Sequence, residues 1–299
     1  MDVGLTGATG HLGSRLVRRL LEDPAVTVVR SVARRPLPPH PKLRHTQADL
    51  AAPRAAKALS GVAVLWHLGF ALWREPGAAA ANRAATRSVL AARPGRVVLA
   101  SSAAVYGAWP DNPCPLTEEA GPRPNPECPY ASQKLEAERI LLGEYPTAVL
   151  RICAVLGPHA DPRVGRAADA YRLAVPAIRG TAQRLQFLHE DDAAAAIHLA
   201  GMSGFTGVCN VATPDWLAAG DIARLAASRV ISLPRTVLLG LAETARCLRI
   251  SPFGADRAVL LSGPLALDPA RAARELGWRA TLGSAHVLRA FLARSRAGR

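Results

Sequence analysis

Residues 3–13 decide the fold and read Val3-Gly4-Leu5-Thr6-Gly7-Ala8-Thr9-Gly10-His11-Leu12-Gly13. The run up to Leu5 predicts a short buried first strand, and the apolar side chains between His11 and Leu21 recur at helical spacing. Strand, glycine-rich turn and helix in this order form the phosphate-binding start of a dinucleotide fold. We therefore expect an α/β protein with a doubly wound parallel sheet of Rossmann type.

Each of the three spaced glycines has a physical task in this turn. Gly7 permits a tight turn, Gly10 lets the backbone approach a pyrophosphate, and Gly13 lets the helix pack closely on the strand. The helix N-terminus adds free N–H groups and the positive end of the helix dipole. The spacing Gly-x-x-Gly-x-x-Gly in this context favours a dinucleotide site over a merely structural turn.

The composition fits one Rossmann-type domain with a smaller C-terminal lobe for the substrate. The chain has 299 residues, of which 49% are hydrophobic, enough for a sizeable core. We expect residues 1–158 to bind the dinucleotide and residues 159–299 to form mainly the substrate-binding lobe, with the segment 184–212 returning to the first domain. An apolar helix pattern over 233–250 is expected to be lobe core rather than the lining of a pocket or an interface.

Neither a membrane nor a metal is indicated. No apolar run approaches the roughly 18 residues of a membrane span, and Met1 leads directly into the first strand without a signal peptide. We therefore expect a cytoplasmic protein without a membrane partner. The five cysteines form no Cys-x-x-Cys pair, so neither a zinc site nor a disulfide framework is predicted.

The charge balance is strongly basic, with a formal net charge of +14. The basic residues are nearly all arginines spread along the chain, without a long block or an aromatic-interleaved stripe, so no nucleic-acid partner is expected. A basic surface also attracts an anionic cofactor or small-molecule substrate at long range.

The end of the second strand bears on the choice of cofactor. This strand is expected from Val26 to Val32 and is followed by Arg34 and Arg35, without an acidic residue. An acidic side chain here would bind the ribose hydroxyls of NAD, whereas arginine favours the 2′-phosphate of NADP. NADP is therefore favoured over NAD, although the arginines could equally be solvated loop residues or stack on adenine.

Two later stretches carry residues suited to proton transfer. Residues 96–102 form an apolar strand ending at Ser102, and its carboxyl end points into the ligand crevice of such a sheet. Tyr130 and Lys134 are four residues apart and share one face of a helix. An adjacent ammonium favours the phenolate of a tyrosine whose pKa is otherwise about 10. Tyr130 can then exchange a proton with a substrate oxygen while hydride passes between carbon and nicotinamide.

The order of these motifs resembles the extended branch of the short-chain dehydrogenase/reductase superfamily, the NAD-dependent epimerase/dehydratase family. The resemblance rests on the turn at 6–13, on Ser-Ser-x-x-Val-Tyr-Gly at 101–107 and on Tyr-x-x-x-Lys at 130–134. Residues 268–278, Asp-x-x-Arg-Ala-x-x-Glu-Leu-Gly-Trp, resemble a C-terminal feature of extended members, so the likeness spans nearly the whole chain.

The resemblance implies a role for each motif residue. Ser102 would hydrogen-bond the reacting substrate oxygen, with Ser101 as its competitor, while Lys134 would tune Tyr130 and hold the nicotinamide ribose. Asp49 would accept from the adenine amino group, although capping of the following helix is a nearly equal alternative. The step at 67–69 resembles the family's His-Leu-Ala-Ala, where small residues pass close to the cofactor. The residues expected at the cofactor are Gly7, Thr9, Gly10, His11, Leu12, Gly13, Arg34, Asp49, Leu50, Leu68, Tyr130 and Lys134.

Departures from the family pattern narrow the expected reaction. Nucleotide-sugar members usually have an asparagine where this chain has Ala154, and dehydratases usually have Asp-Glu where it has Ala103-Ala104. Gln-Phe-Leu-His-Glu-Asp-Asp at 186–192 resembles the family's Gln-Phe-Val-His-Val-Asp-Asp before a helix. Its two aspartates, Asp191 and Asp192, are expected to cap and charge that helix rather than act as catalytic carboxylates.

The sequence therefore favours an NAD(P)-dependent oxidoreductase acting on a carbonyl or alcohol, with Tyr130 as general acid/base. A nucleotide-sugar epimerase that retains NAD is the first alternative. A non-catalytic regulator that senses dinucleotide is the second, and the presence of Tyr130 and Lys134 counts against it. The resemblance also implies dimerisation through helices beside the active site, but no motif in this chain specifies a homodimer.

Overall fold

The apolar runs of the first two thirds of the chain pair as a parallel sheet. The computed structural model describes residues 1–72 and 76–297, with the side chains of 166–169 and 295–297 outside that description. Within these ranges seven strands follow the order β10-β6-β5-β4-β1-β2-β3, all parallel. The predicted doubly wound fold is confirmed. The strands are β1 (Asp2–Thr6), β2 (Val28–Ala33), β3 (Leu43–Gln47), β4 (Val64–His67), β5 (Arg96–Ser102), β6 (Thr147–Ile152) and β10 (Gly207–Val211).

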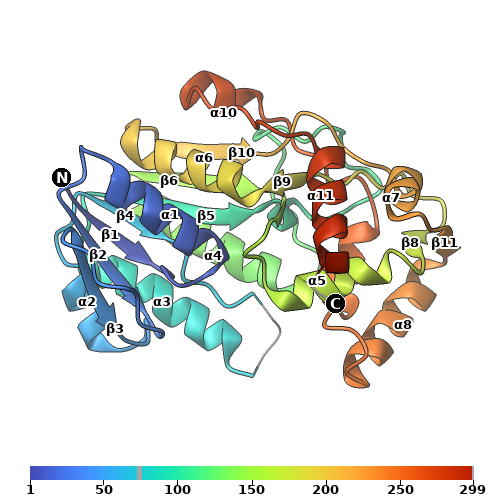
Figure 1. Cartoon of the computed structure of the whole chain (residues 1–299), viewed down its shortest axis with the longest axis horizontal. Coiled ribbons are helices and arrows are strands. Elements are labelled where there is room, and N and C mark those ends of the chain that lie inside the picture. Colours follow the sequence, from blue (N-terminus) through green and yellow to red (C-terminus); the bar gives the residue numbers. More distant parts are fainter. Residues whose placement is uncertain (73–75, 298–299) are drawn as a thin grey trace.

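Helices cover both faces of this sheet, as Figure 1 shows. On one side lie α1 (His11–Glu22) and α6 (Glu190–Met202), and on the other α2 (Pro53–Ala58), α3 (Ala78–Ala92) and α4 (Pro129–Glu144). Successive residues of a strand face opposite sides of the sheet. Val98 of β5 therefore belongs to the core under α1 and α6, whereas Leu99 belongs to the core under α3 and α4.

Contact between α6 and β4 depends on a glycine in the helix. A Cβ at Gly201 would lie 1.9 Å from the Trp66 ring, and the Trp66 indole N–H donates to the Ile197 carbonyl at 2.8 Å. The helix begins where the His189 side chain accepts a hydrogen bond from the Asp191 N–H at 3.2 Å. The two aspartates therefore lie in the first turn, where their negative charges interact favourably with the helix dipole. His189 is the N-cap residue.

Most of the rest of the chain gathers beyond the carboxyl ends of the strands, on the right of Figure 1. Two small parallel sheets pair β7 with β9 and β8 with β11. Segment 264–278 packs against the core under α1 and α6 through Leu265, Leu267, Leu276 and Trp278. These elements are η1 (Ala103–Tyr106), β7 (Ala154–Leu156), α5 (Pro162–Ala170), β8 (Val175–Ile178), β9 (Phe187–His189), α7 (Ala219–Ala226), β11 (Val230–Leu233), α8 (Arg235–Cys247), α9 (Ala255–Ala258), η2 (Val259–Leu261), α10 (Ala270–Glu275) and α11 (Ser284–Ala297).

Two local expectations change in the structure. The second strand begins at Val28 instead of Val26, because the Val26 N–H closes a turn onto the Asp23 carbonyl at 3.2 Å. The apolar pattern at 233–250 forms α8, which buries Leu238 and leaves Leu241 exposed, so only one face is lobe core. Across the described ranges, no helix is long and apolar enough to span a bilayer.

Candidate active site

The glycine turn lies at the point where the strand order reverses. From β1 the chain runs outward through β2 and β3, then returns to the other side of β1 with β4, and such switch points open a ligand crevice at the carboxyl ends of the strands. Gly7 has a φ of +75°, and a Cβ there would lie 2.6 Å from the Gly69 nitrogen, at the end of β4. Thr6 Oγ1 accepts from the Gly69 N–H at 3.0 Å and hydrogen-bonds His67 Nδ1 at 2.8 Å.

The turn has the shape needed for a diphosphate. A Cβ at Gly13 would lie 2.0 Å from the Gly7 carbonyl oxygen, so α1 packs directly on the turn. Gly10 is the N-cap of α1, and a Cβ there would meet one atom within 4 Å, the Gly7 oxygen. The first N–H groups of the helix have no partner inside it and point outward here. Arg35 donates to the Thr9 carbonyl and ties the turn to the segment after β2.

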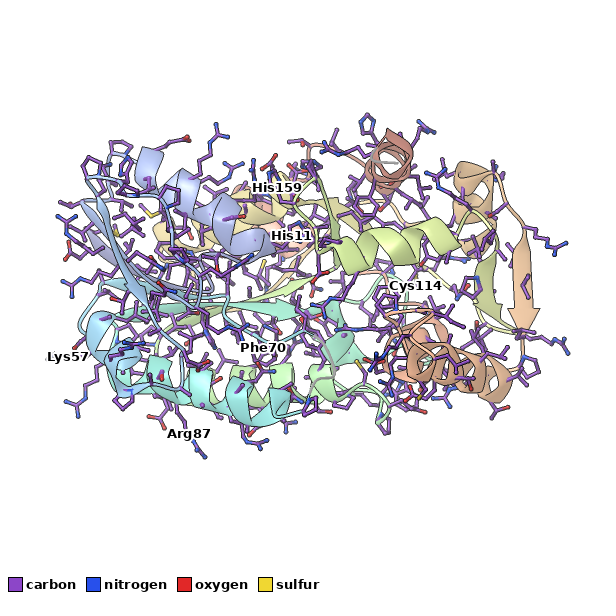
Figure 2. All side chains as sticks on the ribbon, turned by 60° about the horizontal axis from the view of Figure 1, so that its bottom comes forward. His11, Lys57, Phe70, Arg87, Cys114 and His159 are labelled. Carbon is purple, nitrogen blue, oxygen red and sulfur yellow. The ribbon has the colours of Figure 1, made fainter. Side chains whose placement is uncertain are left out.

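A buried carboxylate lies beside this turn, and the sequence reasoning missed it. Glu190 Oε2 accepts from His11 Nε2 at 2.6 Å and from the His159 N–H at 3.0 Å, while Oε1 accepts from His159 Nδ1 at 2.5 Å. Figure 2 labels His11 and His159 on neighbouring segments. Burial by itself raises the pKa of Glu190, but these hydrogen bonds outweigh it and lower the pKa. The signal in the sequence was an acid at 190, where the family step has a valine.

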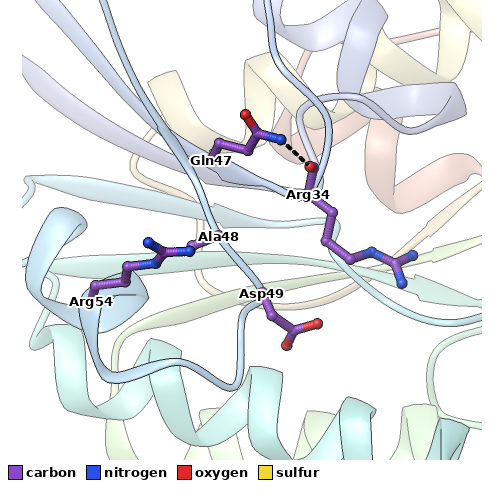
Figure 3. Close-up of a pocket in the computed structure, with 5 residues that line it drawn as sticks. All are labelled: Arg34, Gln47, Ala48, Asp49 and Arg54. Atoms are coloured by element: carbon purple, nitrogen blue, oxygen red, sulfur yellow. Dashed lines mark hydrogen bonds between the residues drawn. The ribbon is translucent and has the colours of Figure 1, made fainter.

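An open cavity of about 290 Å³ lies at the ends of β2 and β3 (Figure 3). Gln47 donates to the Arg34 carbonyl at 3.0 Å, and the side chains of Arg34 and Asp49 point to the same side of the 47–49 segment. The Asp49 carboxylate accepts from the Ala51 N–H at 2.8 Å, but the N-cap of α2 is Ala52, so the capping alternative for Asp49 is wrong. The residues around the cavity are Arg34, Gln47, Ala48, Asp49 and Arg54.

The three leucines expected at the cofactor are partly buried and pack against the two cores of the sheet. Leu12 and Leu68 pack against the core beneath α1 and α6, whereas Leu50 packs against the core beneath α3 and α4. The Leu50 carbonyl also accepts a hydrogen bond from Ser88 of α3. Leu50 is close enough to Gly69 that a Cβ there would lie 2.4 Å from its Cδ1 atom.

Ser102 and Tyr130 meet at the carboxyl end of β5. Ser102 Oγ accepts from the Ala104 N–H at 3.2 Å, which starts η1, and the same side chain interacts with the Tyr130 phenol and lowers its pKa. Ser101 faces the other side of the strand and donates to Glu138, which also binds Arg151 at 2.8 Å. The structure therefore places Ser102, and not its competitor, beside the tyrosine.

Lys134 lies one turn further along α4 and is buried. Its Nζ donates to the Ala100 carbonyl at 2.6 Å and lies 3.8 Å from the centroid of the Phe70 ring. The same nitrogen is 5.9 Å from the centroid of the Tyr130 ring. Burial lowers the pKa of Lys134 to about 7, against the opposing effect of Glu138.

A different cation, and not Lys134, lies over the ring of Tyr130. The Arg257 guanidinium carbon, from α9, lies 4.7 Å from the centroid of the Tyr130 ring. Burial raises the pKa of Tyr130, while the charge of Arg257 and the polar side chain of Ser102 lower it. The sequence predicted Lys134 in this role. Arg257 lies in the lobe, outside every quoted motif, and no local signal pointed to it.

The loop after β4 is held on both sides of Phe70. Asn82 of α3 accepts from the Ala71 N–H at 2.7 Å and donates to the Ala71 carbonyl at 3.2 Å, and it donates to Gln133 at 2.7 Å. Gly69, before Phe70, is bound to Thr6 as described above. Phe70 stands at the second alanine of the resembled His-Leu-Ala-Ala step, and its ring covers the Lys134 ammonium.

Fold and switch-point turn together define a doubly wound α/β protein of the nucleotide-binding class. The model of the NAD dependent epimerase/dehydratase family matches residues 3–212, and the chain belongs to this family. An uncharacterized protein of Mycobacterium tuberculosis is 27% identical over 92% of this chain and 79% of its own length. One of Sinorhizobium fredii is also 27% identical, over 92% of this chain and 73% of its own length.

Solved structures share the fold along the whole chain. MoeE5 in complex with UDP-glucose and NAD is 24% identical with a TM-score of 0.74, covering 100% of this chain and 99% of that one. The dTDP-glucose 4,6-dehydratase DesIV of Streptomyces venezuelae is 19% identical with a TM-score of 0.74, over 100% and 98%. A UDP-glucuronic acid 4-epimerase variant of Bacillus cereus is 16% identical with a TM-score of 0.72, over 100% of both chains.

Proposed function

We propose that the chain is an NAD(P)-dependent oxidoreductase that interconverts a carbonyl and an alcohol in a small molecule. The observation that carries this proposal is the pairing of Ser102, at the carboxyl end of β5, with Tyr130, which lies one helical turn from Lys134. The glycine turn lies two strands away, at the carboxyl end of β1. The proposed proton-transfer residues and the proposed cofactor turn therefore share one edge of the sheet.

The side chains have distinct tasks in this proposal. When bound, the nicotinamide supplies or accepts hydride at the substrate carbon. Ser102 orients the substrate oxygen by a hydrogen bond. Tyr130 Oη gives its proton to that oxygen during reduction and takes a proton from the alcohol during oxidation. Gly10 leaves the start of α1 open to the diphosphate, while Gly7 and Gly13 allow the tight turn and the close packing that shape this site.

For the cofactor we propose a preference for NADP, supported by Arg34 and Arg54 around the cavity at the ends of β2 and β3. Both side chains are exposed, so their charge is available to a 2′-phosphate. Asp49 in the same cavity is suited to accept from the adenine amino group. The structures described above include complexes with NAD, which makes NAD the competing cofactor.

A nucleotide-sugar epimerase with retained NAD is the second candidate. The family match and the fold shared with a UDP-glucuronic acid 4-epimerase favour it. Ala154, which lies in β7 where nucleotide-sugar members carry asparagine, counts against it. The two candidates differ in whether the cofactor leaves in each turnover.

The first experiment purifies the chain without added cofactor, denatures it and identifies the released nucleotide by mass spectrometry. An empty protein that then binds NADPH supports the oxidoreductase, and carbonyl compounds are screened with it. Near-stoichiometric NAD supports the epimerase, and nucleotide sugars are screened instead.

Tyr130→Phe tests the proton-transfer role once a substrate turns over. We expect kcat to fall by about a hundredfold or more, the usual contribution of a positioned general acid/base, while dinucleotide binding is kept. Tyr145→Phe is the matched control, because that hydroxyl donates to the Leu90 carbonyl at 3.0 Å, between α3 and the end of α4. Unchanged turnover by Tyr130→Phe would refute the assignment.

Arg34→Ala and Arg54→Ala test the proposed cofactor preference. Each should weaken NADPH binding about tenfold, as expected for loss of a charge-assisted contact worth about 1.4 kcal/mol, and leave NADH binding unchanged. Arg18→Ala, on the exposed side of α1, controls for net charge. Equal losses for both dinucleotides would show that the arginines do not discriminate between them.

A further inference from the structure

We propose that Arg257 of α9 is a positioning residue that favours the phenolate form of Tyr130, the task that the family resemblance gives to Lys134. This inference rests on the proposed role of Tyr130 as general acid/base. It assigns part of that chemistry to a side chain of the C-terminal lobe rather than to the Tyr-x-x-x-Lys motif.

Arg257 is held against the tyrosine by contacts on three sides. Its guanidinium carbon is 4.7 Å from the centroid of the Tyr130 ring. The guanidinium donates to the Leu72 carbonyl, in the loop after β4, and its Nε lies 3.8 Å from the buried Asp256 carboxylate. An arginine fixed in this way keeps a permanent positive charge over the ring face, where cations interact favourably with an aromatic π system.

The nearest contacts of the Lys134 ammonium are with groups other than Tyr130. Its ammonium is 2.6 Å from the Ala100 carbonyl and 3.8 Å from the Phe70 centroid, which leaves it further from the Tyr130 ring than Arg257 is. Phe70 also meets Tyr130 edge-on, with centroids 6.0 Å apart and an angle of 82° between the rings. Because Asn82 and Thr6 hold the loop on both sides of Phe70, this apolar ring stays over the ammonium.

Several other groups face Tyr130 and bear on its ionisation. Cys128 precedes α4, Ser102 ends β5, and Asp256 accompanies Arg257 on α9. The Cys128 thiol opposes ionisation of the tyrosine, whereas Ser102 and Arg257 promote it. A lysine whose pKa is about 7 loses its charge near neutral pH, but an arginine does not. Arg257 can therefore act over the whole range in which Tyr130 must exchange protons.

The test follows the ionisation of Tyr130 directly, without a substrate. The chain has four tyrosines, and ¹³Cζ-tyrosine labelling gives one NMR titration for each, with Tyr130 assigned by its loss in Tyr130→Phe. We expect Arg257→Gln to raise the pKa of Tyr130 by about one unit, and Arg257→Lys to recover part of the shift because it restores a positive charge. Lys134→Met should shift it less. Arg18→Gln, in the exposed pair with Glu22 on α1, is the matched control.

The outcomes separate the inference from the proposed function. An unchanged Tyr130 titration in folded Arg257→Gln, or a larger shift in Lys134→Met, overturns the role of Arg257 and leaves Tyr130 as the proposed acid/base. If Arg257→Gln does not fold, Arg257→Lys is used in its place. A pKa of Tyr130 above the wild-type value in Arg257→Lys supports the inference. A pKa identical to wild type in Arg257→Lys, together with a large shift in Lys134→Met, overturns it. Loss of turnover in Tyr130→Phe is measured separately and tests the proposed function alone.

Discussion

His67 is a titratable residue that the fold keeps neutral. It lies at the end of β4, where its Nδ1 atom hydrogen-bonds Thr6 at 2.8 Å and its Nε2 atom is buried without a partner in the structure. Burial, with a further contribution from the charge of Lys134, lowers the pKa of His67 to about 3. The side chain thus joins β1 to β4 below the glycine turn, which agrees with a structural histidine.

This burial predicts an acid-sensitive fold. Because the folded pKa lies below the unfolded value of about 6.5, the unfolded chain binds the extra proton between pH 6.5 and 3. The contribution of His67 to stability is therefore complete above pH 6.5 and lost as the pH falls, by at most about 1.4 kcal/mol per unit. Urea unfolding of wild type and His67→Gln from pH 7 to 4.5 measures it. A variant whose stability falls as steeply as that of wild type would contradict this account.

At the scale of elements, a buried ion pair joins α4 to β6. Glu138 accepts from Arg151 at 2.8 Å and from Ser101, and the Arg151 guanidinium carbon lies 4.7 Å from the Tyr106 ring centroid. Both partners are at least 95% buried. This cluster fixes the face of α4 that carries Lys134, and it keeps the Ser101 hydroxyl away from the crevice.

Glu138→Gln should therefore destabilise the fold strongly. It leaves the Arg151 charge buried without its partner, and such single removals cost about 3–5 kcal/mol. Glu22→Gln, in the exposed pair with Arg18, is the control and should leave the free energy of unfolding unchanged. Equal chemical denaturation midpoints for Glu138→Gln and Glu22→Gln would show that the buried pair contributes nothing.

At the scale of the whole molecule, the sheet and the C-terminal segment share one core. Leu267, Leu276 and Trp278 belong to the same cluster as Leu5 and Val98. Asp192 of α6 also accepts from the Thr281 N–H and hydroxyl at 2.9 and 2.8 Å. We propose that residues 1–158 with 184–212 form the dinucleotide-binding domain and that the remainder is mainly substrate lobe, but this domain is completed by segment 264–278.

A chain shortened to residues 1–213 should consequently fail to fold cooperatively. It lacks segment 264–278 and exposes the apolar side chains that this segment covers at the β10 edge. Calorimetry and amide exchange measure the result against the full chain, and a chain lacking only residues 298–299 is the control. A sharp melting transition of the 1–213 chain would show that the first domain is autonomous.

Features that depend on neighbouring residues could be predicted from the amino-acid order. The glycine turn, the strand ending at Ser102 and the helix carrying Tyr130 and Lys134 follow from local backbone preferences and from periodicity, and they define the family and most of the candidate site. The expectation that Asp191 and Asp192 charge the start of their helix is confirmed, whereas the expectation that they cap it is wrong, because the N-cap is His189.

Contacts between side chains from distant parts of the chain became visible in the folded molecule alone. Arg257 bonds the Leu72 carbonyl across 185 residues and lies on Tyr130, while Glu190 reaches His11 across 179 residues. Such contacts depend on how helices pack on the sheet and on which rotamers burial permits, and no spacing in the sequence encodes them. The position of a charged group along the chain is local information, but the charge that it faces is a property of the packed molecule.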